Sequence, residues 1–211
     1  YQIHHHIDLE QGYFLFSDEN ATSVNDTLLY GPYLTDNRGL RHFNKFTKLS
    51  NQFDIGIHTS AFFLNVGIQY RLLNYTNSLS SDQYHDIGVF SKIGLNIKKL
   101  TSLKAEVAFG VGENIGNFNI KPVLEFYGIK GLTLEANIKL LRYDPTIIQR
   151  QAIITDMIVY DNDFSKINEV IIGGKLAIKR LHLDIEINSG VIDNPVYFGT
   201  DAVPVQTSDT K

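Results

Sequence analysis

The sequence of 211 residues contains no cysteine, no tryptophan, one methionine and five prolines. Without cysteine the chain can form neither a disulfide framework nor a thiolate metal site. No apolar run approaches the ~18–20 residues of a membrane-spanning helix. The net charge of −4 lacks the basic excess that is usual in nucleic-acid-binding proteins. An apolar content of 43% excludes a disordered chain, and the length suits a single folded domain.

What the sequence does contain is a long-range alternation of apolar and polar residues. It is clearest in the segments 117–128, 132–140 and 181–188, where one set of side chains is apolar and the other is rich in Asn, Lys, Asp and Glu. A period of two places successive side chains on opposite faces of a β-strand. No segment has the periodicity of a convincing amphipathic helix, so the sequence predicts an all-β fold.

The alternation predicts about nine antiparallel strands, over residues 2–17, 40–59, 62–74, 87–98, 102–112, 117–128, 132–143, 167–179 and 182–189. Strands of soluble proteins average ~5–6 residues, whereas a tilted strand needs ~9–11 residues to cross a bilayer. Several of the predicted strands have at least this length, and their apolar faces carry no charged residue. Length and charge together favour a transmembrane β-barrel over a soluble sheet.

The connections between the predicted strands alternate between short and long. Short links fall near 60–61, 99–101, 129–131 and 180–181, and longer ones fall at 18–39, 75–86 and 144–166, with a shorter one at 113–116. Tight turns on one side and longer loops on the other are typical of bacterial outer-membrane barrels, which have even strand numbers. The odd count, and a start at Tyr1 within an alternating segment, indicate that residues 1–211 form part of a single, larger up-and-down barrel domain.

In such a barrel the polar faces would line the lumen. The predicted lining residues are Lys92, Lys104, Glu106, Lys121, Glu125, Glu135, Lys139, Lys175, Asp184 and Glu186. Both signs of charge are present, so no strong ion selectivity is expected. A two-residue turn in the last hairpin would place Lys175 opposite Glu186, a type of pair that contributes ~0.2–1 kcal/mol.

Several short segments resemble a known family in their order and spacing. They are the segment from Tyr33 to Phe43, and the series 141–149, 160–166, 193–198 and 203–207, which includes Tyr143-Asp144-Pro145, Ser165-Lys166, Asp193-Asn194-Pro195 and Val205-Gln206. The chain resembles the putative porin family of Bacteroidota outer membranes over essentially its whole length, with Tyr160 standing where tryptophan is expected. The resemblance implies an outer-membrane location and a pore-like role, and it supplies no catalytic or binding residue.

Other candidate sites have simpler structural explanations. His4, His6, Asp8 and Glu10 share one face of the first strand and suit Zn²⁺ or Cu²⁺, but a polar lumen wall is the favoured explanation. Asp18-Glu19-Asn20 and Asp161-Asn162-Asp163 offer oxygen ligands for Ca²⁺, yet neither fits the calcium-loop pattern, and such runs usually form turns. The segment 36–39 is interpreted as a loop-to-strand junction in which Gly39 takes a positive φ. We therefore expect no metal and no cofactor.

These observations predict an outer-membrane porin-like barrel for passive diffusion of small hydrophilic solutes. Its partners would be the outer-membrane bilayer, those solutes and other outer-membrane proteins, with no nucleic acid. The alternative is a non-conducting barrel that serves as the scaffold of a secretion or surface-protein assembly. A soluble all-β binding module is a third hypothesis, which the long strands and the lack of tryptophan oppose. An enzyme ranks last, because the sequence shows no Ser/His/Asp set and no Gly-x-Ser-x-Gly elbow.

Overall fold

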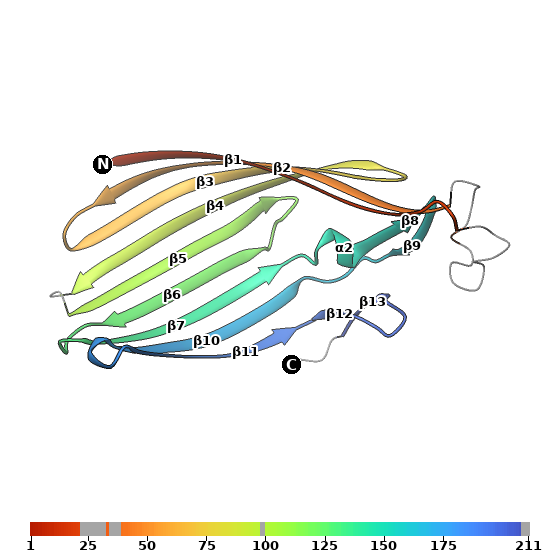
Figure 1. Ribbon diagram of the computed structural model, residues 1–211. Coiled ribbons are helices and arrows are strands. Elements are labelled where there is room, and N and C mark those ends of the chain that lie inside the picture. The colour runs from red at the N-terminus through yellow and green to blue at the C-terminus, as the bar shows by residue number, and fades with distance from the viewer. Residues whose placement is uncertain (22–32, 34–38, 98–99, 208–211) are drawn as a thin grey trace.

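The structure, a computed structural model, describes residues 1–21, 33, 39–97 and 100–207. Its main element is a sheet of nine strands in the order β1-β2-β3-β4-β5-β6-β7-β10-β11, with every neighbouring pair antiparallel (Figure 1). The strands are β1 (Gln2–Asp18), β2 (Leu40–His58), β3 (Phe62–Asn77), β4 (Ser81–Ile97), β5 (Thr101–Gly112), β6 (Phe118–Phe126), β7 (Leu132–Tyr143), β10 (Ile167–Ile178) and β11 (Leu183–Asp193). The prediction of an all-β, antiparallel, up-and-down fold is confirmed.

The sheet is open within the described residues, because β1 and β11 form its two edges. The sequence predicted part of a larger barrel, and the described residues form an open sheet without closure. The strands have 9 to 19 residues. Lengths of this order meet the ~9–11 residues that a tilted strand needs to cross a bilayer.

One predicted connection is wrong, and it concerns the link at 75–86. β3 continues to Asn77 and β4 begins at Ser81, so that only residues 78–80 connect them. The sequence did not predict these strand ends, because residues 81–86 are polar on both faces and therefore show no alternation of apolar and polar side chains. Backbone pairing with β3 nevertheless continues as far as Thr76 opposite Ser81. In the same way β11 extends to Asp193, four residues past its predicted end.

The two long connections, 19–39 and 144–166, lie at one end of the sheet and the predicted tight turns at the other (Figure 1). The connections 78–80 and 113–117, at the long-loop end, are as short as those turns. The long-loop end also carries short elements that were not predicted: α2 (Ile147–Arg150), β8 (Gln151–Ile154), β9 (Met157–Asp161), β12 (Val196–Phe198) and β13 (Pro204–Gln206). The β10–β11 connection occupies residues 179–182, not a two-residue turn, yet Lys175 does lie opposite Glu186. No helix in the described residues is long and apolar enough to cross a membrane.

The two faces of the sheet differ sharply in character. The first, here called the apolar face, includes Val66, Ile138 and Ile172, which are 54%, 41% and 61% exposed. Within the described strands its charged residues are Arg41, Lys45, Arg142 and Asp193, all near the long-loop end. The second, here called the polar face, carries the acidic and basic side chains of the strand centres. A broad exposed apolar surface of this kind is far larger than soluble monomers tolerate.

Glycines let aromatic rings lie flat on the crowded polar face. Three phenylalanines stand directly opposite a glycine on the neighbouring strand: Phe46 opposite Gly12, Phe90 opposite Gly67 and Phe63 opposite Gly94. In each pair the ring occupies the space that a Cβ atom on the glycine would need. Gly39, with φ 77°, has the predicted positive φ, while residues 36–38 lie outside the described residues.

Replacing Gly67 by alanine is expected to cost about 1–3 kcal/mol of unfolding free energy, the usual range for overpacking. The new Cβ would lie 2.5 Å from the carbonyl oxygen of Phe53 and would also meet the ring of Phe90. Gly88→Ala is the matched control, because its Cβ would come no closer than 3.4 Å to a neighbour. Urea unfolding in phospholipid vesicles measures both, and equal costs would contradict the packing described.

Candidate functional site

The ten predicted lining residues all lie on the polar face. Cross-strand register places Lys92 opposite Glu106, Glu106 opposite Lys121, and Glu135 opposite both Glu125 and Lys175. Lys139 shares the β7 face of Glu135, Lys104 shares the β5 face of Glu106, and Asp184 shares the β11 face of Glu186. The sequence therefore assigned these side chains to one face correctly.

Several of these residues form ion pairs or hydrogen bonds across the strands. Lys104 Nζ lies 2.6 Å from Glu125 Oε2, and Lys92 Nζ lies 3.6 Å from Glu106 Oε1. Tyr127, just beyond the end of β6, donates its hydroxyl to the same Glu125. That hydrogen bond, followed by burial, raises the pKa of Tyr127 to about 12, so that the phenol stays protonated. Glu186 accepts a hydrogen bond of 2.8 Å from Asn188.

Strands β1 to β4 add charged pairs to the polar face that the sequence did not single out as lining. Arg71 Nη2 lies 2.5 Å from Asp86 Oδ2, which stands opposite it in the register. Lys48 donates to both oxygens of Glu10, at 3.1 and 3.2 Å. The predicted start of the fourth strand at residue 87 excluded Asp86, and an earlier start would have revealed the pair.

Three of the candidate metal ligands, His4, Glu10 and Asp18, are held by other partners. His4 Nδ1 lies 3.0 Å from Asp54 Oδ1, and Glu10 pairs with Lys48. Asp18 Oδ1 accepts the backbone N–H groups of Asn20 and Ala21, as in an ordinary turn. Among the described residues no group of three or more His, Asp and Glu side chains is placed to hold a metal ion.

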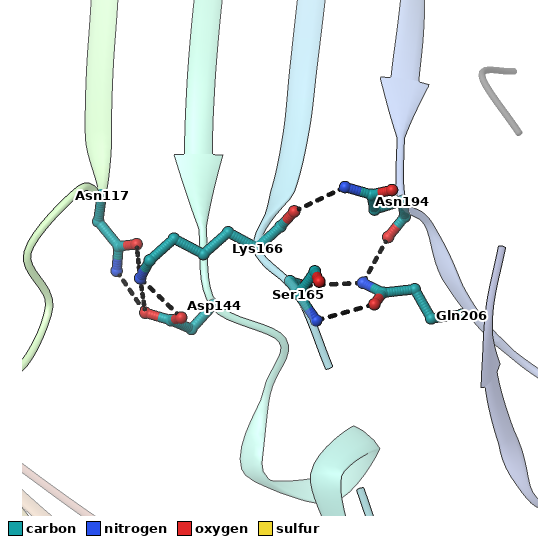
Figure 2. Close-up of polar contacts among 6 residues, drawn as sticks. All are labelled: Asn117, Asp144, Ser165, Lys166, Asn194 and Gln206. Carbon is teal, nitrogen blue, oxygen red and sulfur yellow. Dashed lines mark hydrogen bonds and ion pairs between the residues drawn. The ribbon is translucent and has the colours of Figure 1, made fainter. Parts of the chain in front are cut away.

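A polar cluster ties together four strand ends at the long-loop end of the sheet (Figure 2). Lys166 Nζ, just before β10, lies 2.7 and 2.8 Å from the two oxygens of Asp144, just after β7. It also donates to Asn117 Oδ1 at 2.7 Å, and Asn117 Nδ2 donates to Asp144 Oδ2 at 2.8 Å. The ends of β6, β7 and β10 are thus linked through the ion pair of Lys166 and Asp144, whose side chains are both partly exposed.

The same cluster continues toward β11 through amide groups. Asn194 Nδ2 donates to the backbone oxygen of Lys166 at 3.3 Å. Gln206, in β13, accepts from Ser165 N at 2.8 Å and donates to Ser165 O at 2.7 Å and to Asn194 O at 2.9 Å (Figure 2). Asp144, Lys166, Asn194 and Gln206 each come from a different one of the four motif segments of the second series, which the fold brings together.

Asp144→Asn is expected to lower the unfolding free energy by about 1 kcal/mol at neutral pH, a value reduced for partial exposure. Burial by itself raises the pKa of Asp144, but the hydrogen bonds from Lys166 and Asn117 outweigh it, so the pKa lies below its ordinary value. The stabilisation is therefore present above the unfolded-state pKa, about 3.9, and is lost as the pH falls through the lower folded-state pKa.

Unfolding measured from about pH 7 down to about pH 2.5 checks this, since the difference between wild type and Asp144→Asn should close only below about pH 4. Asp163→Asn is the matched control, because Asp163 is exposed and lies in the same loop. A difference that stays constant to the lowest pH would contradict a role for the Asp144 charge.

The connection between β7 and β10 crosses the polar face and is attached to β2. His42 Nδ1 lies 2.6 Å from the backbone oxygen of Ile153, and Thr155 N donates to Arg41 O at 2.5 Å. Thr155 is fully buried and has a φ of 56°, which is rare for a β-branched residue and is retained only where contacts enforce it. β2 and β7 are five strands apart, so this connection, here called the crossing loop (residues 145–165), bridges about 24 Å of sheet.

The crossing loop and the polar face line an open cavity of about 850 Å³. β1 to β4 contribute aromatic and aliphatic side chains, and the loop contributes Ile147, Ile148 and Arg150. The buried apolar residues of the described chain, Ala21, Leu40, Tyr75, Ile153 and Ile167, also belong to this end. A cavity of this size and character is typical of a small-molecule site.

Comparison with known proteins gives one family. The model of the family described as "Putative porin" matches residues 1–210, which is nearly the whole chain. The match confirms the resemblance that the motif segments predicted. No curated protein and no solved structure matches the chain.

Proposed function

The chain belongs to the family described as "Putative porin", and from this premise we propose that it forms a passage across the bacterial outer membrane for passive diffusion of small hydrophilic solutes. The observation that carries the proposal is the separation of the two faces. The apolar face is charge-free through the strand centres, whereas the polar face carries the charged residues there. Such a sheet suits lipid on one side and water on the other. The proposal includes no enzymatic activity.

The charges of the ten predicted lining residues predict weak ion selectivity. The ten predicted lining residues are five lysines and five carboxylates, which sum to zero, and the pairs Lys104–Glu125 and Lys92–Glu106 neutralise one another locally. Selectivity would then depend mainly on the width of the passage. Planar bilayers and solute-loaded liposomes test the proposal with the purified protein. Ion currents with a cation-to-anion permeability ratio near one support it, and a protein that inserts but passes neither ions nor sugars would refute it.

One observation favours the alternative, a non-conducting barrel that acts as the scaffold of a secretion or surface-protein assembly. The crossing loop is fixed at its base by the Asp144–Lys166 pair and at its tip by β2, so it obstructs the polar face at one end. A scaffold would remain closed after the loop is removed and would co-purify with partner proteins in fixed ratio. Removal of the loop therefore separates the two proposals.

A further inference from the structure

The cavity under the crossing loop is apolar although it lies on the polar face. Phe14, Phe46, Tyr75 and Tyr84 line it from the strands, and Ile147 and Ile148 line it from the loop. Phe14 is 55% exposed, Phe46 41% and Ile148 62%, so that large apolar side chains are left uncovered inside the site. If the loop only packed against the sheet, it would cover these side chains. Their exposure indicates space for the apolar part of a ligand.

Arg150 is the distinctive charge of this cavity. The other cations there are neutralised by carboxylates, Arg71 by Asp86 and Lys48 by Glu10. The side chain of Arg150, by contrast, makes no ion pair within the part of the chain that the structure describes, and its buried Nε atom, like that of Arg71, has no hydrogen-bond partner. A buried guanidinium nitrogen without an acceptor is costly, and carboxylates are the acceptors that suit the guanidinium group best.

A second cavity, of about 420 Å³, adjoins the first and has the opposite charge. Both are lined by Tyr84, Ile147 and Arg150, so the two cavities meet at these residues. The smaller cavity adds the carboxylates of Asp82, Asp161 and Asp163. Together the two cavities offer the guanidinium of Arg150 for an anionic group, carboxylates for a cationic group, and aromatic side chains for an apolar group.

From this arrangement we propose that the site binds short zwitterionic peptides with apolar side chains, with the C-terminal carboxylate at Arg150, the ammonium group toward Asp82, Asp161 and Asp163, and the side chains against Phe14, Phe46 and Tyr84. The inference rests on the proposed function in that it names a solute class for the passage. A peptide of two or three residues fits the size of the two cavities. A purely hydrophilic solute would leave the aromatic wall unused.

Calorimetry with the protein in lipid nanodiscs tests the proposal with four probes: Phe-Leu, its C-terminal amide, its N-acetyl derivative and Gly-Gly. Phe-Leu is expected to bind about tenfold or more tighter than its amide, since the amide lacks the charge-assisted bond to Arg150. The N-acetyl derivative should bind several-fold more weakly than Phe-Leu, and Gly-Gly should not bind measurably. Equal binding of all four, or binding of none, would overturn the proposal.

Arg150→Gln isolates the role of the guanidinium group. It should reduce Phe-Leu affinity about tenfold while leaving the affinity of the amide nearly unchanged. Arg180→Gln, the same change at the exposed tight-turn end, is the control and should alter neither. An equal effect of the two substitutions on Phe-Leu would refute the assignment. Binding in nanodiscs does not require conduction, so loss of peptide binding with intact currents refutes only this inference, and binding without currents refutes only the passage.

Discussion

Ile172→Lys is expected to lower the unfolding free energy in a bilayer by about 2–4 kcal/mol, the cost of a cationic side chain facing lipid near the bilayer midplane. Ile172 lies at the centre of β10, on the apolar face, and is 61% exposed. Its neighbours across the strands are Ile138 and Ser189, which offer no counter-charge. The lysine would either lose the hydration of its ammonium group or distort the bilayer.

The adjacent residue provides the matched control for this substitution. Ile171 is the same amino acid one position earlier and therefore points to the polar face, opposite Lys139 and Gly190. Ile171→Lys is expected to cost less than about 1 kcal/mol, because the new charge reaches water and the repulsion from Lys139 is screened. Urea unfolding of both variants in phospholipid vesicles makes the comparison. Equal costs would mean that the apolar face does not contact lipid.

Removal of residues 147–163 is expected to raise single-channel conductance about twofold or more, because pore width governs passage. The deletion keeps the base of the crossing loop intact, since Tyr143 and Ile167 are paired where β7 ends and β10 begins, and a Gly-Ser-Gly turn can join Thr146 to Phe164. It removes α2, β8 and β9, and with them the contacts of Ile153 and Thr155 with β2. Planar-bilayer recording of the wild type and the variant measures the change.

A Gly/Ser segment of the same length in place of residues 147–163 is the control for this deletion. It keeps the number of residues but loses the two attachments to β2, so its currents should fluctuate between small and large values. Unchanged conductance in both variants would show that the loop does not narrow the passage. Absence of current from wild type and variants alike would favour the scaffold alternative.

The sequence predicted the faces of the sheet well because alternation is a local property. Lys175 lies opposite Glu186 as predicted, although the turn that joins their strands is longer than expected, because register depends on the sum of turn and strand lengths. Where alternation is lost, as at 81–86, the prediction failed, since the hydrogen bonds of β4 with β3 need no apolar side chain. The strand ends are therefore set by pairing with a neighbour, which a single segment does not reveal.

The candidate site, in contrast, was only partly visible in the sequence. The motif segments around Asp144, Lys166, Asn194 and Gln206 were noticed as family features, but their convergence into one hydrogen-bonded cluster depends on the order of β7, β10 and β11 (Figure 2). The sequence did not indicate Arg150 as a binding residue, because a single arginine in a loop is common. Its significance comes from a cavity formed by residues more than sixty positions away, such as Tyr84 and Phe46.

The sequence alone excluded a disulfide framework and a membrane-spanning helix, because it lacks cysteine and long apolar runs, and its lack of tryptophan opposed a soluble binding module. Its period of two determined that the chain forms long antiparallel strands with one apolar and one charged face. Each strand carries that information in its own residues, because successive side chains point to opposite sides of the backbone. Tertiary structure alone decided that residues 145–165 cross the polar face to β2 and that Arg150 lies beside an aromatic wall. Such contacts join residues far apart in the chain, and they exist only once the strands are paired in order.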